Sequence, residues 1–207
     1  MQLILATQNA HKVEEVREIA PGHSVLLPSD FGIDFDFEER GATFLENSYG
    51  KAEALYTELA ARGVARSAAA DGVVVIADDS GLCVDALGGA PGVLTARFGS
   101  PDGVTKLSAA DRNAYLLSKI AGESNRAAHY VCTITAILGA DRFFVVQETW
   151  EGEIALEASS GTGGFGYDPV FYLPDLGCTA ADISAEQKHA LSHRGKALRE
   201  IIETLTI

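Results

Sequence analysis

The sequence predicts an α/β protein whose mixed β-sheet has helices on both sides. Short β-rich runs alternate along the chain with segments in which apolar residues recur at helical spacing. The apolar run 73–77 has the composition of a strand that is buried on both faces. The runs 130–138 and 142–150 are separated only by Gly139, Ala140 and Asp141, which indicates an antiparallel hairpin. This order of elements is typical of α/β proteins.

The first elements are a strand, a loop and a helix. Gln2 to Thr7 is β-rich, Gln8 to Ala10 forms a turn, and the segment HKVEEVREIA predicts a helix. A second helix is expected from about 43 to 62, because apolar residues share one of its faces: Leu45, Tyr49, Ala52, Tyr56 and Leu59. The opposite face carries polar and small residues: Thr43, Glu46, Asn47, Gly50 and Lys51.

Capping residues mark the helices of the second half. Ser108 is expected to cap a helix that ends near Gly122, and Ser184 with Gln187 forms a capping-box pattern. A last helix is expected from Ser192 onward. No repeat, low-complexity tract or linker divides the chain, so residues 1–207 are interpreted as a single domain.

Composition excludes several classes of protein. A hydrophobic content of 47% suffices for a substantial core, and the longest apolar runs are far shorter than the ~20 residues of a spanning helix. The net charge of -13 repels nucleic acid and anionic membranes, so neither is an expected partner. Cys83, Cys132 and Cys178 lack the spacing of a zinc or redox site and are interpreted as reduced, mostly buried thiols. The apolar start is too short for a signal peptide, which favours a cytoplasmic enzyme.

The residues Asp78-Asp79-Ser80-Gly81 directly follow the predicted buried strand. Strand ends are where α/β proteins place ligand-contacting groups. Two adjacent carboxylates point in different directions, so one can hold a magnesium ion while the other orients or deprotonates a water. Phosphoanhydride hydrolysis needs this division of roles, although an isolated segment of this kind also fits a solvated turn.

A small anionic substrate would need local positive charge in this acidic chain. Glu46 and Lys51 share a face of the second helix, where they could serve a metal and a phosphate or form a surface ion pair. Thr7 to Lys12 lie between strand and helix, so backbone amides, the helix N-terminus and Lys12 could cradle a triphosphate. This loop lacks the P-loop pattern, and polar turns of this kind are common.

The segment GTGGFGYDP, residues 161–169, sets four glycines around two aromatic residues. Phe165 could stack on a purine while Asp168 binds its edge, or Phe165 and Tyr167 could pack inward. Further along, His193 and Arg194 are donors at the start of the last helix. Donors suit the 6-oxo group of a purine better than the amino group of adenine, although a His-Arg pair is also common on surfaces.

Five segments together resemble the inosine triphosphate pyrophosphatase family, also described as dITP/XTP pyrophosphatases. They are TQNAHK, TFLENSYGKA, ADDSGLCVDALGGAPGVLTARF, GGFGYDPVF and KHALSHRGKAL, and their order matches from end to end. The resemblance implies an elongated mixed α/β fold with two lobes around a central substrate cleft. It also implies a homodimer and a magnesium-dependent cut between the α and β phosphates, with manganese as an alternative metal.

The resemblance also assigns roles to residues of this sequence. Asp79 resembles the catalytic residue that activates water, and Glu46, Asp79 and Asp78 resemble metal-site carboxylates. One set resembles the phosphate and sugar contacts: Thr7, Gln8, Asn9, Ala10, His11, Lys12, Lys51 and Ser80. Another set resembles the base-recognition residues, with Arg97 as a further contact: Phe165, Gly166, Tyr167, Asp168, Lys188, His193 and Arg194. Gln8 and His189 depart from residues common in the family, which leaves the fine base preference open. Segments 34–40 and 61–71 are interpreted as variable surface.

The predicted function is hydrolysis of non-standard purine nucleoside triphosphates, such as ITP, dITP and XTP, to the monophosphate and pyrophosphate. Three alternatives stay open: a pyrophosphatase for modified pyrimidine nucleotides or dUTP, a nucleotide sensor without turnover, and a general acidic α/β binding protein. A substrate panel separates the first from the predicted enzyme. Saturable ITP binding without pyrophosphate release would indicate the second.

Overall fold

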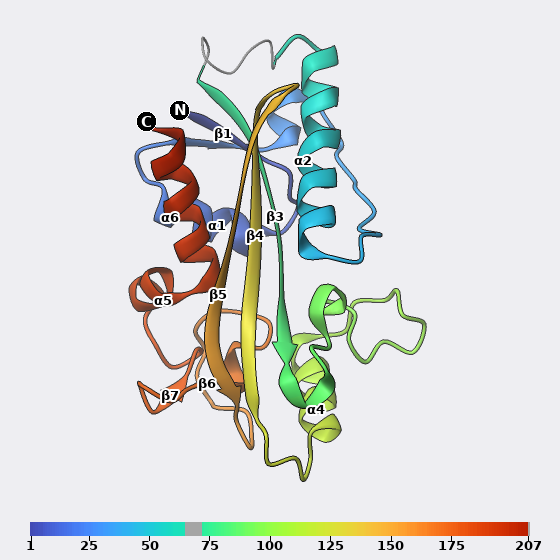
Figure 1. Ribbon diagram of the computed structural model, residues 1–207, viewed down its shortest axis with the longest axis vertical. Coiled ribbons are helices and arrows are strands. Elements are labelled where there is room, and N and C mark those ends of the chain that lie inside the picture. Colours follow the sequence, from blue (N-terminus) through green and yellow to red (C-terminus); the bar gives the residue numbers. More distant parts are fainter. Residues whose placement is uncertain (65–71, 207) are drawn as a thin grey trace. The chain divides into compact units, whose positions relative to one another are not determined.

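The computed structural model describes residues 1–64 and 72–206. It contains a seven-stranded sheet with the strand order β2-β1-β3-β4-β5-β6-β7 (Figure 1). The strands are β1 (Gln2–Leu5), β2 (Ser24–Leu26), β3 (Val73–Val84), β4 (Ala127–Gly139), β5 (Arg142–Ile154), β6 (Phe171–Leu173) and β7 (Cys178–Thr179). β1 pairs in parallel with β2 and β3, whereas β6 pairs antiparallel with β5 and β7. The prediction of a mixed sheet is confirmed.

The helices begin where the sequence places capping residues. They are α1 (Ala10–Ile19), α2 (Phe44–Ala61), α4 (Ala109–Lys119), α5 (Ala185–Leu191) and α6 (His193–Leu205). Thr43, Ser108 and Ser184 each accept a hydrogen bond from the backbone N–H three residues further on. Within the part of the chain that the structure describes, no helix is long and apolar enough to cross a membrane. The segment interpreted as surface at 61–71 lies outside the described residues from position 65 on.

The chain divides into two compact units. Unit 1 comprises Met1–Asp79, Cys132–Glu148 and Arg194–Ile207, and unit 2 comprises Ser80–Val131 and Thr149–His193. Each unit is therefore assembled from segments that lie far apart in the sequence. β3, β4 and β5 contribute residues to both units.

In unit 1, helices cover both faces of the sheet (Figure 1). One face packs Leu5, Val74 and Ile76 with apolar residues of α1 and α6. The other face packs Val75 and Ala77 with Ala52, Leu55 and Leu59 of α2. Successive side chains of a strand point to opposite faces, so Asp78 follows the first set and Asp79 the second. The two carboxylates therefore face different helices.

β3 is longer than the sequence predicts. The expected strand ends at Ala77, because Asp, Ser and Gly are uncommon inside strands, but β3 continues through Asp78 and Asp79 to Val84. Burial explains the extension, since Leu82 and Val84 belong to the core of unit 2. The placement of the two carboxylates after the strand end is thus wrong, because they lie inside the strand.

The buried face of α2 also differs from the predicted apolar face. Leu45 is 47% exposed, whereas Asn47 and Lys51, which the pattern assigns to the opposite face, are buried, and so is Ser48. The Ser48 hydroxyl lies 3.1 Å from the carbonyl oxygen of Ala77 and 2.9 Å from a Thr135 hydroxyl oxygen. Polar partners on the sheet thus determine this face, and helical periodicity of apolar residues cannot reveal them.

In unit 2, α4 packs into an aromatic core. Leu116 and Ile120 contact a cluster that includes Tyr130, Trp150 and Phe171. The ring centroids of Tyr130 and Phe171 are 4.6 Å apart, and those of Trp150 and Phe171 are 5.3 Å apart. Large rings therefore fill much of the interior of unit 2, which also contains most of the predicted base-recognition residues.

All three cysteines have free thiols. Cys132 is buried, whereas Cys83 and Cys178 are half-buried, so the expectation of mostly buried thiols holds fully only for Cys132. Burial raises the pKa of Cys132 to about 12. This thiol therefore stays protonated at neutral pH and behaves as a small apolar side chain.

Candidate functional site

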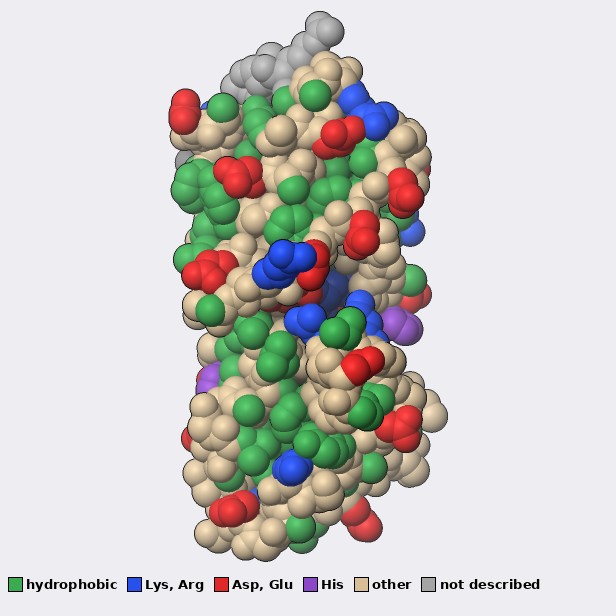
Figure 2. Space-filling view, turned by 90° about the vertical axis from the view of Figure 1, so that its right-hand side faces the viewer, with side chains coloured by type: hydrophobic (Ala, Val, Ile, Leu, Met, Phe, Trp, Pro, Cys, Tyr) green, Lys and Arg blue, Asp and Glu red, His purple; other side chains and the backbone are tan. Residues whose placement is uncertain are grey.

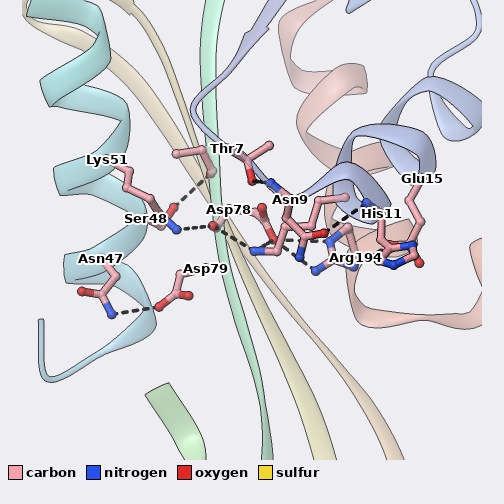
Figure 3. A network of polar contacts seen from close by, with 12 residues as sticks. Thr7, Asn9, His11, Glu15, Asn47, Ser48, Lys51, Asp78, Asp79 and Arg194 are labelled. Carbon is pink, nitrogen blue, oxygen red and sulfur yellow. Dashed lines mark hydrogen bonds and ion pairs between the residues drawn. The ribbon is translucent and has the colours of Figure 1, made fainter. Parts of the chain in front are cut away.

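Four charged side chains of unit 1 form the Asp78 cluster: Lys12, Glu15, Asp78 and Arg194. Figure 3 labels Glu15, Asp78 and Arg194. The ammonium nitrogen of Lys12 lies 2.9 Å from Oδ2 of Asp78, and Nη2 of Arg194 lies 3.2 Å from the same oxygen. Arg194 also pairs with Glu15 through Nη1. The four side chains are only 4% to 15% exposed, so two cations balance two carboxylates in a largely solvent-shielded cluster.

The Asp78 carboxylate is held in its charged form. Burial alone would raise the pKa of Asp78, but the positive charges of Lys12, Arg194 and Lys51 outweigh burial and hold it well below its usual range. Burial would likewise lower the pKa of Arg194, yet Asp78 and Glu15 raise it further above its ordinary value. Asp78 is therefore a fixed negative charge and a poor base.

A second group in unit 1 is the Asp79 cluster: Glu39, Asn47, Lys51 and Asp79. The amide nitrogen of Asn47 donates to Oδ2 of Asp79 over 2.9 Å (Figure 3). The pKa of Asp79 is raised to about 6, first by burial and then by the negative charge of Glu39, whereas Lys51 acts to lower it. A carboxyl group with a pKa near the working pH suits general-base catalysis.

Lys51 links the two clusters within unit 1. Its ammonium group donates to the carbonyl oxygen of Asp78 over 2.8 Å and forms an ion pair with Glu39. Burial would lower the pKa of Lys51, but Asp78, Glu39 and Asp79 outweigh it and raise the pKa. Lys51 is thus a buried, charged lysine among carboxylates. The alternative of a surface ion pair with Glu46 does not describe it.

No sequence pattern indicates a role for Glu39. It belongs to segment 34–40, which is interpreted as surface, but this segment contacts two predicted functional residues, Gln8 and Lys51, and packs beside Gly50. Its Phe35 carbonyl accepts from Gln8 over 2.6 Å, and a Cβ on Gly50 would lie 2.9 Å from the Phe37 ring. Its Glu39 pairs with Lys51. An acid-rich stretch without periodicity gave no signal of these contacts, which are entirely tertiary.

Glu46 has a different environment from the one predicted for a metal ligand. It is exposed in the first turn of α2, and its Oε2 accepts a hydrogen bond from the backbone of Ala42 over 2.6 Å. Its own backbone N–H is capped by Thr43. These contacts stabilise the start of the helix, a role that needs no ligand.

The loop 7–12 opens α1 as expected. Asn9 caps the helix by accepting from the backbone of His11 over 3.0 Å, and the Thr7 hydroxyl accepts from the backbone of Asn9 over 3.2 Å. Gln8, Asn9, Ala10 and His11 are exposed, and Lys12 turns into the Asp78 cluster. An exposed helix N-terminus beside a lysine is suited to an anion.

In unit 2, the Asp168 cluster consists of Tyr130, Phe165, Asp168 and Lys188. Oδ2 of Asp168 accepts from the backbone of Phe165 over 2.7 Å and from Lys188 over 2.8 Å. The Tyr130 hydroxyl lies 3.4 Å from Oδ1 of Asp168. The lysine nitrogen is 4.7 Å from the centroid of the Phe165 ring. Residues 165–168 therefore form a turn fixed by a buried ion pair, which we call the Phe165 turn.

The two aromatic residues of this turn have different environments. Tyr167 is 3% exposed and packs inward, whereas Phe165 is half-buried. The two alternatives left by the sequence thus apply to different residues, and only Phe165 offers ring surface to a ligand. Gly166 between them has a φ of 69° and is half-buried.

His193 and Arg194, predicted together as base donors, belong to different units. The His193 ring is 6% exposed and stacks on Tyr130 with a centroid distance of 4.6 Å and an interplanar angle of 3°. Arg194 is tied to Asp78 and Glu15 in unit 1. Ser80 and Arg97 are half-buried in unit 2.

The carboxylates of the Asp79 cluster fit a divalent cation. Among the described residues, no three His, Cys, Asp or Glu side chains gather as a ready metal site. Magnesium, however, is commonly held by one or two carboxylates together with substrate phosphates and water. Asp79 and Glu39 supply hard oxygen ligands, and repulsion by the negative charge of Glu39 adds to burial in raising the pKa of Asp79. A bound cation would relieve that repulsion, whereas Asp78 already has two cationic partners.

The fold is that of an α/β protein whose strand β3 carries two adjacent carboxylates with contrasting charge environments. The chain belongs to the Ham1 family, whose model matches residues 3–204. It is 46% identical over 201 residues to a dITP/XTP pyrophosphatase of Treponema denticola, and the matched region covers 97% of this chain and 96% of the relative. It is 38% identical over 208 residues to a dITP/XTP pyrophosphatase of Clostridium perfringens, which covers 99% and 97%.

Solved structures show the same fold. The Ham1 protein of Staphylococcus aureus matches with a TM-score of 0.80 and 36% identity, over 100% of this chain and 98% of that one. A HAM1 protein from Coxiella burnetii matches with a TM-score of 0.83 and 33% identity, over the same shares of both chains. The α/β fold expected from the sequence is therefore confirmed.

Proposed function

We propose that the protein hydrolyses non-standard purine nucleoside triphosphates, such as ITP, dITP and XTP, to the monophosphate and pyrophosphate and so removes them from the nucleotide pool. The observation that carries the proposal is the contrast between Asp78 and Asp79, whose environments move their pKa values in opposite directions. Such a pair separates a fixed charge from an acid-base group. The names of relatives at 38% to 46% identity support the substrate class.

Asp79 is the proposed general base. The oxygen of a water molecule forms a bond to phosphorus, the bond from that phosphorus to the α-β bridging oxygen breaks, and the water proton passes to Asp79. A pKa of about 6 leaves Asp79 mostly ionised at neutral pH and more basic than an ordinary carboxylate. Pyrophosphate leaves with the electrons of the broken bond.

Lys12 and Lys51 are the proposed stabilisers of the leaving group. The Lys12 ammonium group contacts the carboxylate of Asp78, and the Lys51 ammonium group contacts its carbonyl oxygen. Two fixed positive charges therefore lie next to this residue. Preorganised cations stabilise negative charge that develops in a transition state without reorganising during the reaction. The exposed segment Thr7 to His11 and Ser80 are proposed to contact phosphate and sugar.

Asp79 and Glu39 are proposed as the main ligands of magnesium, with manganese as an alternative ion. Glu46 and Asp78, the other carboxylates expected from the sequence, are proposed to contribute less, because each already has partners within the protein. When bound, the ion supplies neutralisation and alignment of phosphate oxygens. Because the Asp79 cluster offers two carboxylates rather than three, substrate phosphates are expected to complete the ligand set.

The Phe165 turn is proposed to recognise the base. The half-buried ring of Phe165 offers a stacking surface, and Asp168 fixes both the turn and the Lys188 ammonium group. N–H donors from Lys188, His193 and Arg194 suit a 6-oxo purine, and an adenine amino group would leave such donors unmatched. Gly166 and Tyr167 are proposed to shape the turn.

A cytoplasmic homodimer is part of the proposal. On β5 in unit 1, Phe143 and Val145 are 48% and 39% exposed, which leaves apolar surface available for a second copy. Light scattering should give twice the chain mass of 21.8 kDa at micromolar concentration. A mass of one chain under those conditions would refute the dimer.

Product analysis tests the proposed reaction. The account expects ITP to give IMP and pyrophosphate in equal amounts, because the cut falls between the α and β phosphates. Release of IDP and inorganic phosphate would assign the cut to another bond and contradict the proposal. Hydrolysis in labelled water should place the label in only one of the two products.

A further inference from the structure

A side chain of α4 binds the Phe165 turn from inside unit 2. Asn113 is 5% exposed, and its Nδ2 donates to the carbonyl oxygen of Gly166 over 3.2 Å. A carbonyl oxygen only accepts, so this bond fixes the orientation of the amide. The other end of the amide, Oδ1, is then an acceptor that is buried and has no hydrogen-bond partner within residues 1–64 and 72–206.

The preceding residue, Arg112, contacts the same turn by another route. Its Nη1 donates to the carbonyl oxygen of Ala96 over 3.0 Å, and its guanidinium carbon lies 5.6 Å from the centroid of the Tyr167 ring. The Tyr167 hydroxyl in turn donates to the carbonyl oxygen of Thr95 over 2.9 Å. Two consecutive residues of α4 thus connect the 95–96 segment with the two central residues of the Phe165 turn.

Core stability alone does not account for these two polar residues. Oδ1 of Asn113 and Nε of Arg112 are both buried without a hydrogen-bond partner among the described residues, and such atoms cost free energy of folding. An apolar side chain at position 113 would avoid that cost, because Leu116 and Ile120 nearby in the same segment already pack into the apolar core. Local rules are usually broken where function requires it.

We propose that Asn113 and Arg112 are positioning residues that hold the Phe165 turn in the conformation that recognises the purine base. This inference rests on the proposed function, because that function gives the turn its base-binding role. Asn113 acts on the carbonyl directly after Phe165, and Arg112 acts on the Tyr167 ring. Neither residue needs to touch the nucleotide.

The test compares Asn113→Leu with Ser108→Ala. The first variant removes the bond to Gly166 and keeps a side chain of similar volume. The second removes the N-cap bond of Ser108 to the backbone of Asp111, so it weakens α4 without touching the turn. Melting temperature, KM and kcat for ITP and ATP, IMP binding by calorimetry, and inhibition by inorganic tripolyphosphate are measured for both variants.

For Asn113→Leu, KM for ITP should rise roughly five- to tenfold, the factor that one lost hydrogen bond gives, while kcat stays within about twofold. The preference for ITP over ATP and the affinity for IMP should fall by a similar factor. Inhibition by tripolyphosphate, which has no base, should not change. Ser108→Ala should lower the melting temperature and leave the ITP/ATP preference intact.

Unchanged KM, ITP/ATP preference and IMP affinity in Asn113→Leu would overturn the inference, and so would an equal loss of preference in Ser108→Ala. If Asn113→Leu does not fold, Arg112→Met takes its place with the same expectations. A wild-type protein that binds IMP without hydrolysing ITP would refute the proposed function, and IMP affinity of the variants would still decide the inference. A wild-type protein that neither binds IMP nor hydrolyses ITP would refute both.

Discussion

Asp78 and Asp79 show what sequence can and cannot establish for single residues. Their side chains point to opposite faces of the sheet, because the two residues are neighbours in a strand and strand side chains alternate between faces. Their roles depend on partners far away in the chain, since Asp78 pairs with Lys12 and Arg194 while Asp79 bonds to Asn47. No local pattern connects these positions. The pKa contrast that supports an acid-base role was therefore beyond prediction from the sequence alone.

Substitutions of Glu39 and Glu46 are predicted to change the magnesium affinity to different extents. Glu39→Gln should raise the magnesium concentration needed for half-maximal pyrophosphate release by at least about tenfold. The substitution removes one of the two carboxylates, Asp79 and Glu39, that are proposed to hold the ion. Glu46→Gln should change that concentration by less than about threefold, since its carboxylate binds the backbone of Ala42. Magnesium titrations of both variants provide the measurement.

The control for this comparison is the circular dichroism melting curve of each variant, which separates metal affinity from folding. A large shift in Glu46→Gln together with a small one in Glu39→Gln would reverse the assignment and restore the ligand set expected from the sequence.

At the scale of elements, the strands and helices were predictable, and their exact limits and faces were not. Periodicity and caps placed α2 and α4, because both signals are local. The continuation of β3 beyond Ala77 and the buried polar face of α2 depend on contacts with other parts of their units. Tertiary burial overrode local propensity at both places.

Backbone conformation and close packing are structural reasons for glycine in segment 161–169. Composition alone cannot distinguish these reasons from a role in ligand binding. Gly164 and Gly166 have φ values of 66° and 69°, where L side chains are strained. A Cβ on Gly164 would lie 2.0 Å from Oδ2 of Asp168 and 3.0 Å from the Lys188 nitrogen, whereas a Cβ on Gly166 would meet nothing within 4 Å. Only Gly164 is required by the buried ion pair.

This difference predicts unequal losses of stability. Gly166→Ala should lower the free energy of unfolding by about 1–2 kcal/mol, the strain of a left-handed residue. Gly164→Ala should lower it by roughly 3 kcal/mol or more, because the new methyl group displaces the Asp168 carboxylate from Lys188. Denaturant unfolding of the two variants measures both values. Equal losses would mean that the Asp168 cluster shifts without cost.

For the whole molecule, the net charge bears on the class of partner but does not identify one. Figure 2 shows Asp and Glu side chains spread over the visible face with Lys and Arg among them, in keeping with a net charge of -13. This field disfavours nucleic acid, whereas a small anion would depend on local cations such as Lys12 and Arg194, which already pair with Asp78. The order of elements predicted the fold class, and the family resemblance predicted the substrate class. The resemblance also implied two lobes, but which segments make up each of the two units came only with the structure.

The most direct test of the central claim is pyrophosphate release from ITP, XTP, dITP, GTP and ATP, each with magnesium and with EDTA, by the wild-type protein and by Asp79→Asn. The account predicts fast, metal-dependent release from ITP, XTP and dITP, slow release from GTP and ATP, and a loss of roughly two to four orders of magnitude in Asp79→Asn. Near-normal turnover in that variant, or no release from any nucleotide despite tight ITP binding, would contradict it.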